Sequence, residues 1–267
     1  MKWLLTFGLI CLLGARMTVQ DVEWVAHRGE SADAPENTLA AFKLAWERGV
    51  KAIELDVHLS ADGALVVSHD ADTKRTTGVE KKIKETDSRT LLDLDAGRWK
   101  DPRWAGEKLP LLDDALATIP DGSKCYVEVK VGPEAIPALV DAIHRSGKKP
   151  EQLVIISFEP ETVAEAKRKL PEIQAYFLSS PKRDEQGVLR PTTQELIAKA
   201  KELGADGLDL AYKAVDAQAV QEIKAAGLGV TVWTVDKPED ANALIKAGVD
   251  GITSNHPAWL MKQVDRP

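Results

Sequence analysis

Cysteine is scarce in this sequence, which contains only Cys11 and Cys125 among 267 residues. Two cysteines, one of them in an N-terminal apolar run, exclude a disulfide framework. Basic residues are outnumbered by acidic ones, 35 to 42, which gives a formal net charge of −7. Because no basic run or stripe occurs, neither a nucleic-acid backbone nor an anionic membrane is expected as the main partner. An anionic ligand must therefore be held by local positive charge.

An apolar run long enough to span a membrane is also missing. The N-terminal run Trp3–Ala15 has 13 residues, whereas a membrane-spanning helix needs ~20. The run ends in Leu13-Gly14-Ala15, which is typical of a cleavage site, so we expect residues 1–15 to be a signal peptide and the mature chain to be periplasmic or extracellular. Lipid attachment through Cys11 is the alternative, and the bulky Ile10 before it disfavours that reading.

The rest of the chain alternates short β-branched runs with amphipathic segments. This alternation, with no linker rich in proline, glycine or serine, predicts an α/β fold, a single-domain (β/α)8 TIM barrel over residues 21–267. A doubly wound open sheet is the alternative for the same pattern. The eight expected strands are Val22–Ala26, Ala52–Val57, Cys125–Val129, Leu153–Ser157, Ile173–Leu178, Gly207–Leu210, Gly229–Val235 and Gly251–Thr253.

Residues that begin and end helices agree with this alternation. Asn37 is expected to cap the helix that begins near Leu39, and Gly49 is expected to end it. Pro160 and Pro238 are expected to open two later helices, because proline suits the first helical turn.

One region breaks the alternation of strands and helices. The segment Val66–Leu111 is polar and rich in turn residues, and Ala64–Ser68 is expected to pair as a short extra strand at its start. We therefore predict a short excursion after the second barrel strand. Excursions of this kind commonly carry specificity at the carboxyl ends of barrel strands.

Charged residues interrupt two of the expected strands. Glu54 and Asp56 stand two residues apart, so they project from the same face of one strand, about 7 Å apart. Glu128 and Lys130 repeat this arrangement on the next strand. Three converging carboxylates form a hard oxygen-ligand site suited to Mg²⁺ or Ca²⁺. The alternative is that these charges are simply solvated at the barrel rim.

Two histidines lie at strand ends in the same way. His27 precedes Arg28 and Gly29, and His69 follows the run that ends at Ser68. Imidazoles exchange protons near neutral pH and a guanidinium binds oxyanions, so the two strand ends suggest an acid/base site for an anionic substrate.

Other candidates are less specific. His58, His144 and His256 are interpreted as structural, and Trp233 either lines a pocket or packs inside the barrel. Cys125 is interpreted as a small core residue.

The charge balance of this group favours a bound cation. The three carboxylates outnumber Arg28 and Lys130 by one, so the bare cluster would repel a phosphodiester. A divalent cation would change the net charge of the cluster from negative to positive and allow an anionic substrate to bind.

At this point the chain resembles the glycerophosphodiester phosphodiesterases of the barrel-shaped phosphodiesterase superfamily. The resemblance runs from about Val25 to Pro257 and rests on the order of its motifs: His27-Arg28-Gly29, Pro35-Glu36-Asn37-Thr38, Glu54-Leu55-Asp56-Val57, His69-Asp70, Arg75-Thr76-Thr77-Gly78, Leu94-Asp95-Ala96-Gly97, Glu128-Val129-Lys130, Ser157-Phe158 and Val232-Trp233-Thr234-Val235. The sequence departs from the family pattern at Asp236, where asparagine is frequent, and in the charged segment Glu80–Glu85.

The resemblance implies metal-dependent hydrolysis of a small-molecule glycerophosphodiester to glycerol 3-phosphate and an alcohol. Its implied site residues are His27 and His69 for acid/base catalysis, Glu54, Asp56 and Glu128 for metal ligation, Arg28 and Lys130 for phosphate binding, and Trp233 for the substrate pocket. Which histidine is the acid stays open. The resemblance permits attack either by water or by the substrate's own glycerol hydroxyl.

Two other functions compete with this interpretation. A related phospholipase D-like or C-like enzyme acting on intact lipid would need apolar side chains at the rim, for which Trp99 and Trp104 are the candidates. A non-catalytic barrel that binds glycerophosphodiesters is the other alternative. Such a barrel would have no use for two histidines in addition to three carboxylates.

Overall fold

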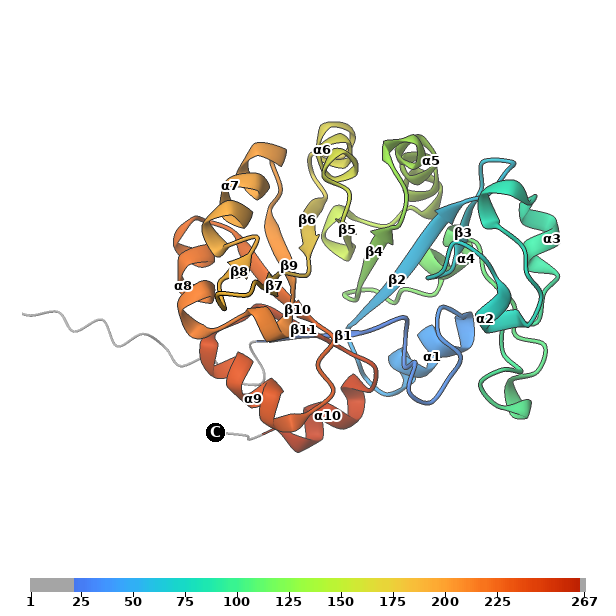
Figure 1. Cartoon of the computed structure of the whole chain (residues 1–267). Helices are drawn as coiled ribbons and strands as arrows, with labels where there is room; N and C mark the ends of the chain where they lie inside the picture. Colours follow the sequence, from blue (N-terminus) through green and yellow to red (C-terminus); the bar gives the residue numbers. More distant parts are fainter. Residues whose placement is uncertain (1–21, 265–267) are drawn as a thin grey trace, which may run out of the picture.

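Eight parallel strands close into a barrel in the computed structural model, which describes residues 22–264 (Figure 1). Pairing of the first strand with both the second and the last closes the sheet, which confirms the (β/α)8 barrel and excludes the open sheet. All eight predicted strands are present, with ends that shift by two residues at most. They are β1 (Glu23–Ala26), β2 (Ala52–Leu59), β4 (Lys124–Val129), β5 (Leu153–Ser157), β6 (Gln174–Ser179), β9 (Gly207–Ala211), β10 (Gly229–Trp233) and β11 (Gly251–Ser254).

Helices surround the barrel on the outside. Pro160 and Pro238 open α6 and α9 as predicted, and Gly49 follows the end of α1 with a φ of 83°. The helices are α1 (Leu39–Glu47), α4 (Leu112–Ala117), α5 (Ile136–Ser146), α6 (Pro160–Lys169), α7 (Thr193–Leu203), α8 (Ala217–Ala225), α9 (Pro238–Ala247) and α10 (Pro257–Gln263). Among the residues described, no helix combines the length and hydrophobicity needed to cross a bilayer.

The cap of α1 differs from the prediction. Thr38, not Asn37, is the N-cap, and its side chain accepts a hydrogen bond from the backbone of Ala41. Asn37 takes a left-handed conformation with a φ of 58° and turns its amide toward Asp56. The prediction was wrong because a buried carboxylate is a stronger partner for the amide than a helix N-terminus, and the next residue can cap the helix instead.

The predicted excursion follows β2. Strand β3 (Leu65–Val67) pairs antiparallel with β2, and the chain then forms α2 (Lys74–Thr77), α3 (Ser88–Leu92) and 3₁₀ turns at Ile83–Glu85 and Pro102–Trp104. These segments lie beside the barrel at the right of Figure 1 and have a small apolar core of their own. The excursion places His69 and the residues that support it next to the barrel mouth.

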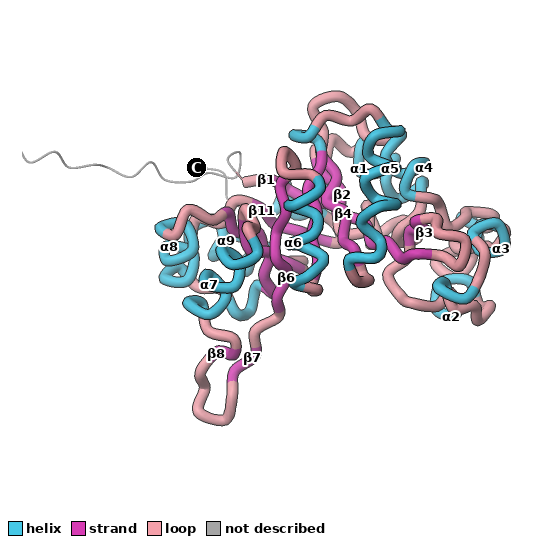
Figure 2. Tube along the Cα trace, turned by 90° about the horizontal axis from the view of Figure 1, so that it is seen from above, coloured by secondary structure: helices cyan, strands magenta, loops and turns pink. Residues whose placement is uncertain are grey.

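Smaller elements complete the fold. A hairpin of β7 (Lys182–Arg183) and β8 (Leu189–Arg190) extends away from the barrel, as Figure 2 shows. Further 3₁₀ turns occupy Pro133–Ala135, Pro150–Gln152 and Tyr212–Ala214. The expected signal peptide, residues 1–15, lies outside the described residues.

Tyr176 on β6 fills the interior of the barrel. A Cβ atom built on Gly207 would lie 2.6 Å from its ring, and one on Gly229 would lie 2.3 Å from its hydroxyl oxygen. Only glycine leaves room for the tyrosine at these two positions. Tyr176 packs with Tyr126, Val154 and other apolar residues, so the barrel has a solid core and not a pore.

Cys125 is buried in the layer between the barrel and its helices, together with Val127 and Val129. Burial, with the nearby charge of Glu54, raises the pKa of its thiol well above the usual value. The thiol is therefore held neutral and behaves as the small core residue that the sequence predicts.

Candidate active site

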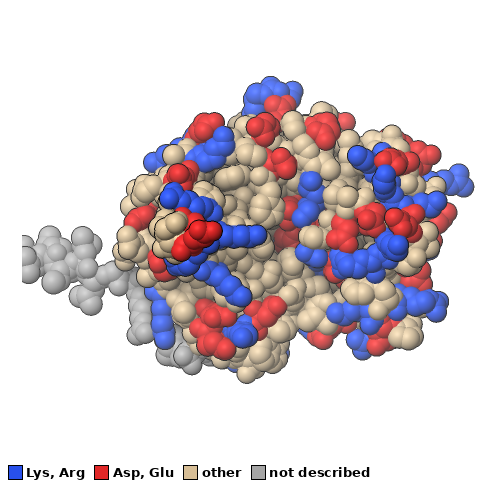
Figure 3. Space-filling view, in the orientation of Figure 1, with Lys and Arg blue, Asp and Glu red and all other residues tan. Residues whose placement is uncertain are grey.

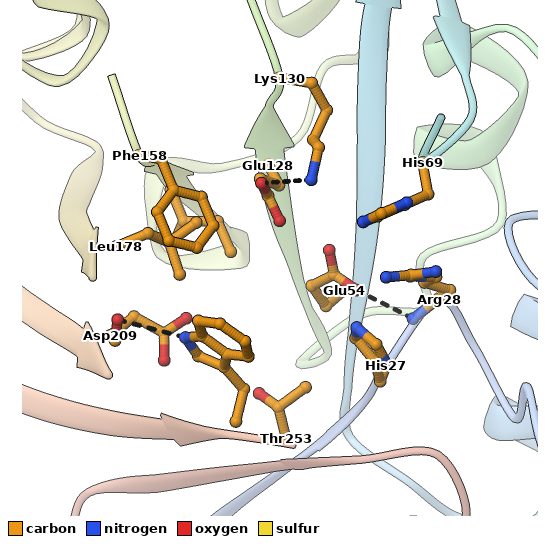
Figure 4. Close-up of a pocket in the computed structure, with 12 residues that line it drawn as sticks. His27, Arg28, Glu54, His69, Glu128, Lys130, Phe158, Leu178, Asp209 and Thr253 are labelled. Carbon is orange, nitrogen blue, oxygen red and sulfur yellow. Dashed lines mark hydrogen bonds and ion pairs between the residues drawn. The ribbon is translucent and has the colours of Figure 1, made fainter. Parts of the chain in front are cut away.

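A cavity of about 210 Å³ opens at the carboxyl ends of the barrel strands (Figure 4). Such a volume lies below the ~300–1,000 Å³ that is usual for drug-sized ligands, so the cavity suits a small molecule. Figure 3 shows acidic and basic side chains interspersed over the face viewed there, so selectivity for charge must arise inside the cavity. Its walls are formed by His27, Arg28, Glu54, His69, Glu128, Lys130, Ile156, Phe158, Leu178, Asp209, Trp233 and Thr253.

Three carboxylates meet at one side of this cavity. Glu54, Asp56 and Glu128 each offer one oxygen, and the three atoms lie within 4.8 Å of one another. Within residues 22–264, Oε1 of Glu54 and Oδ1 of Asp56 are buried without a hydrogen-bond partner. Buried carboxylate oxygens without partners are costly unless they bind a cation. The residues therefore fit one divalent cation with hard, oxygen-based coordination.

Asp56 is held in place by several neighbours. Asn37 Nδ2 donates to its Oδ2 at 2.8 Å, and Arg28 Nε lies 3.2 Å from the same oxygen. Lys130 Nζ lies 3.3 Å from Oδ1 without forming a well-aligned hydrogen bond. Burial alone would raise the pKa of Asp56, but Arg28 and Lys130 outweigh it and lower the pKa. Asp56 is thus the carboxylate of the three that stays ionised most readily.

The other two carboxylates behave in the opposite way. Burial and the charge of Asp56 raise the pKa of Glu54 well above its usual value and that of Glu128 to about 7. Lys130 Nζ donates to Glu128 Oε1 at 2.7 Å, and the backbone N–H of Arg28 donates to Glu54 Oε2 at 2.9 Å. Three neighbouring acids cannot all ionise here without more positive charge, which a divalent cation would supply.

The backbone at Arg28 and Gly29 brings the chain close to Glu54. Arg28 has a φ of 55° and Gly29 a φ of 80°. A Cβ atom on Gly29 would lie 2.6 Å from the backbone of Ala41, so only glycine fits at this position. The unusual turn aims both the N–H and the guanidinium of Arg28 at the acidic cluster, and strained backbone of this kind is typical of functional sites.

His27 is oriented through its Nδ1 atom. Nδ1 lies 2.8 Å from Asn255 Oδ1, and Asn255 Nδ2 donates to Asp236 Oδ2 at 2.6 Å. Because the amide nitrogen is used by Asp236, Asn255 presents its oxygen to His27, so Nδ1 carries the proton and Nε2 is free. Burial and the neighbouring Arg28 lower the pKa of His27 to about 4, which keeps the imidazole neutral.

His69 is oriented by a carboxylate. Its Nδ1 lies 2.8 Å from Asp70 Oδ1, and Arg75 Nε donates to Asp70 Oδ2 at 2.6 Å. Arg75 also binds Glu36, which in turn accepts from Arg28 at 2.7 Å. The hydrogen bond from Arg75 lowers the pKa of Asp70 to about 2. A chain of ion pairs therefore links the excursion to the barrel and holds the two histidines at the same cavity.

His58 supports this arrangement indirectly. Its ring Nε2 lies 3.1 Å from the backbone oxygen of His69, and the side chain is buried beneath the loop. It does not line the cavity, in agreement with its structural interpretation. His144 stands in the last turn of α5, and His256 is the N-cap of α10 and packs against Trp259.

The opposite side of the cavity is largely apolar. Trp233 and Phe158 meet edge to face with ring centroids 5.7 Å apart, and Leu178 lies beside them (Figure 4). The indole Nε1 of Trp233 donates to the backbone oxygen of Asp209 at 3.3 Å. The cavity thus has one charged side and one side built from aromatic and aliphatic groups.

The structure brings all the candidate residues from the sequence together at this cavity. Asp56 lies just behind its wall, where it contacts both Arg28 and Lys130, and the other seven line it directly. Sequence reasoning missed Asn37 and Asn255 as orienting residues and Asp209 as a cavity residue. Asp209 carried the same signal as Glu54, an acid inside an apolar strand. The partners of the two asparagines had no sequence signal, because they depend on loop conformation.

Comparison with known proteins identifies the family of this chain. The sequence model of the glycerophosphoryl diester phosphodiesterase family matches residues 27–259. A glycerophosphodiester phosphodiesterase of Caldanaerobacter subterraneus is 34% identical over 244 residues, which are 90% of this chain and 96% of that protein.

Solved structures are similar over the same length. A phosphodiesterase of Oleispira antarctica, in complex with the product sn-glycerol-3-phosphate, has a TM-score of 0.81 and 32% identity, covering 90% of this chain and 96% of the other. A glycerophosphodiester phosphodiesterase of Parabacteroides distasonis has a TM-score of 0.74 and 29% identity, covering 91% and 96%. The family match, these relatives and the geometry of the cavity together lead to one conclusion: the chain belongs to the glycerophosphoryl diester phosphodiesterase family.

Proposed function

We propose that this protein hydrolyses glycerophosphodiesters to glycerol 3-phosphate and an alcohol, with the help of one divalent cation, Mg²⁺ or Ca²⁺. The observation that carries the proposal is that two imidazoles, two positively charged side chains and three carboxylates line or adjoin one small cavity. The product complex of the Oleispira antarctica relative supports the choice of substrate. A cation bound by the carboxylates would supply Lewis-acid polarisation of the phosphoryl oxygens.

Arg28 and Lys130 bind the phosphodiester in this proposal. Both cations face the cavity and are already held by carboxylates, so their positions are fixed before the substrate arrives. The anionic phosphodiester then meets two positive groups whose side chains need little further ordering. In this proposal the reacting phosphorus lies between His27 and His69, which both line the cavity.

The contacts of the two histidines suggest different roles. His27 has a neutral amide partner and stands beside the Arg28 cation, so it stays neutral and can accept the proton of the attacking hydroxyl at Nε2. His69 has a carboxylate partner instead, Asp70, which orients its ring through Nδ1. We propose that His69 donates a proton from Nε2 to the departing alcohol oxygen.

Product analysis tests this function and identifies the nucleophile. Purified protein is incubated with glycerophosphocholine and either Mg²⁺ or Ca²⁺, and glycerol 3-phosphate and choline are measured. We expect both products in equal amounts, and none after chelation. Transient 1,2-cyclic glycerophosphate would identify the substrate's own hydroxyl as the nucleophile, whereas its absence in rapid-quench samples would identify water. Release of phosphocholine, or no turnover with either cation, would refute the proposal.

Intact lipid is a less suitable substrate. Trp99 is 40% exposed, but it lies in the excursion, where its indole Nε1 donates a hydrogen bond to the backbone oxygen of Ala96. Trp104 is half-buried, so it offers less apolar surface to a lipid than a fully exposed tryptophan would. The same product analysis, repeated with phosphatidylcholine or sphingomyelin vesicles, is expected to give at most a small fraction of the rate. A faster rate on vesicles than on glycerophosphocholine would favour the phospholipase alternative.

We propose further that the chain is exported through its N-terminal segment. The 13-residue apolar run that ends at Ala15 supports this, with small residues where cleavage is expected. N-terminal sequencing of the protein recovered from the producing cells is expected to begin near Arg16. Protein that retains Lys2 would contradict export by this route.

A further inference from the structure

Three side chains that follow neighbouring barrel strands are joined by hydrogen bonds at the mouth of the barrel. His27 follows β1, Asn255 follows β11 and Asp236 lies beyond the end of β10, and these strands are adjacent in the sheet order β1-β11-β10 (Figure 1). The backbone N–H of His27 donates to the backbone oxygen of Ser254 at 2.9 Å, which extends the pairing of β1 with β11 past the strand ends. Asp236 does not line the cavity, so it can act on the substrate only through its neighbours.

Asp236 determines which way the amide of Asn255 faces. Its Oδ1 accepts from the backbone N–H of Asn255 at 2.9 Å and from the hydroxyl of Ser254 at 3.0 Å. Its Oδ2 lies 2.6 Å from the side-chain amide of Asn255. Because a carboxylate can only accept hydrogen bonds, the amide atom that faces Asp236 must be the nitrogen. The amide oxygen is therefore turned toward His27, whose Nδ1 lies 2.8 Å away.

The direction of these hydrogen bonds fixes the proton of His27. The amide oxygen of Asn255 can only accept, so it requires an N–H at Nδ1 of His27, and it also accepts from the hydroxyl of Ser31 at 3.1 Å. A neutral imidazole carries a single ring proton, so Nε2 keeps a free lone pair, as a general base requires. The carboxylate of Asp236 thus controls the tautomer of a ring that it does not contact.

We propose that Asp236 is a positioning residue that acts through Asn255 to hold the proton of His27 on Nδ1, and that positions 236 and 255 work as a pair that needs one carboxylate. This inference rests on the proposed function, in which His27 accepts a proton at Nε2. It also explains the departure from the family pattern at Asp236. An asparagine at position 236 is compatible with the same His27 tautomer only if position 255 supplies the carboxylate instead.

The variant Asp236→Asn is expected to turn the hydrogen bonds round. Its amide oxygen must stay opposite the backbone N–H of Asn255, so its amide nitrogen takes the place of Oδ2. Two amide nitrogens would then face each other unless the side chain of Asn255 rotates by half a turn. After that rotation the amide nitrogen of Asn255 donates to Nδ1 of His27, and the ring proton moves to Nε2, where the ring cannot act as a base.

Exchanging the two side chains is expected to restore the original direction. In the exchange variant, Asp236→Asn/Asn255→Asp, the amide nitrogen at position 236 donates to the carboxylate at position 255. That carboxylate accepts from Nδ1 of His27, as the amide oxygen does in the wild type. A residue that only stabilised the loop would gain nothing from this exchange, so the exchange variant distinguishes a positioning role from a structural one.

Two measurements on the purified full-length protein test the proposal. Nitrogen-15 NMR at pH 8 in the presence of Mg²⁺ identifies the ring nitrogen of His27 that carries the proton, and His27→Gln assigns the signals. The wild type and the exchange variant are expected to carry it on Nδ1, and Asp236→Asn on Nε2. On glycerophosphocholine, kcat of Asp236→Asn is expected to fall by about 10²-fold with KM within about twofold, because only general-base catalysis is lost. The exchange variant is expected to recover kcat to within about tenfold of the wild type.

Asp250→Asn provides a matched control. Asp250 lies at the other end of β11, where its Oδ2 accepts from the backbone N–H of Val230 at 2.9 Å and its Oδ1 pairs with Lys224 at 2.7 Å. Its side chain is 38% exposed, and that of Asp236 is 37% exposed. The control variant is expected to melt at a lower temperature but to keep the wild-type kcat and the proton on Nδ1 of His27.

The outcomes separate the two proposals. A proton on Nδ1 in Asp236→Asn, or a folded exchange variant that carries it on Nε2 or stays inactive, would refute the role of Asp236. A proton on Nε2 without a loss of kcat would show that the His27 tautomer does not matter for turnover and would also refute it. If Asp236→Asn does not fold, the exchange variant decides by the same criteria. If the wild type hydrolyses no glycerophosphodiester with either cation, the proposed function has failed, while the NMR spectra still show whether Asp236 holds the proton of His27.

Discussion

Replacing Asn37 tests its two contributions separately: the hydrogen bonds of its amide and its left-handed backbone conformation. Its amide forms hydrogen bonds with the Asp56 carboxylate at 2.8 Å and with the Asp56 backbone N–H at 3.3 Å. Its backbone also adopts a left-handed conformation, with a φ of 58°. The variant Asn37→Ala loses the hydrogen bonds and keeps an unfavourable backbone, whereas Asn37→Gly loses the hydrogen bonds but adopts the same backbone without strain.

The expected magnitudes follow from these contacts. Loss of a hydrogen bond to a charged group costs about 1.5–3 kcal/mol in both variants. The left-handed backbone costs alanine about 1 kcal/mol more than glycine. In a chain of this length that difference corresponds to about 2–4 °C, so we expect Asn37→Gly to melt higher than Asn37→Ala by that amount.

The two Asn37 variants are expected to differ in stability but not in metal affinity. Residues that orient a metal ligand contribute about 10–100-fold to affinity, and both variants lose the same orienting amide. Calorimetric titration with Mg²⁺ or Ca²⁺ is therefore expected to show the same loss in both, while thermal unfolding distinguishes them. Wild-type metal affinity in either variant would refute the role of Asn37, and equal melting temperatures would refute the backbone argument.

Three further predictions concern catalysis, the backbone and pH. His27→Ala and His69→Ala should each reduce kcat by at least ~10²-fold on glycerophosphocholine, and near wild-type rates would remove that histidine from the mechanism. Gly29→Ala should lower the free energy of unfolding by about 2 kcal/mol or more in denaturant titrations, since the methyl group would lie 2.6 Å from Ala41; an unchanged midpoint would contradict the fold of this turn. The pKa of Asp209 is raised to about 7, above its unfolded value, so the free energy of unfolding should fall as pH rises from about 4 to 7, by at most about 4 kcal/mol from this residue. Asp209→Asn should remove this part of the pH dependence of the free energy of unfolding. Identical pH dependence in the wild type and the variant would refute this prediction.

The barrel and the acidic cluster could be predicted because their signals are local. Each parallel strand is a short apolar run, and an acid inside such a run, as at Glu54 and Asp56, must point at a solvated or metal-binding interior. The carboxyl ends of all strands meet at one face of a closed barrel, so residues far apart in sequence converge without further information.

The supporting contacts could not be predicted in the same way. Asn37 resembled a helix cap because its true partner, Asp56, reaches it only through a left-handed turn. The link from Arg75 through Glu36 to Arg28 depends on how the excursion folds back on the barrel. Asp209 was predictable in principle, since it interrupts its strand as Glu54 does, but no neighbouring cation or histidine in the sequence drew attention to it.

The most direct test of the account is metal binding by the three carboxylates. Chelator-treated protein is titrated with Mg²⁺ and, separately, with Ca²⁺, and activity on glycerophosphocholine is followed alongside binding, for the wild type and for Glu54→Gln, Asp56→Asn and Glu128→Gln. We predict one ion per chain, activity that returns in proportion to binding, and loss of both in each variant. Full activity in the chelated wild type, or unchanged metal affinity in the variants, would contradict the account.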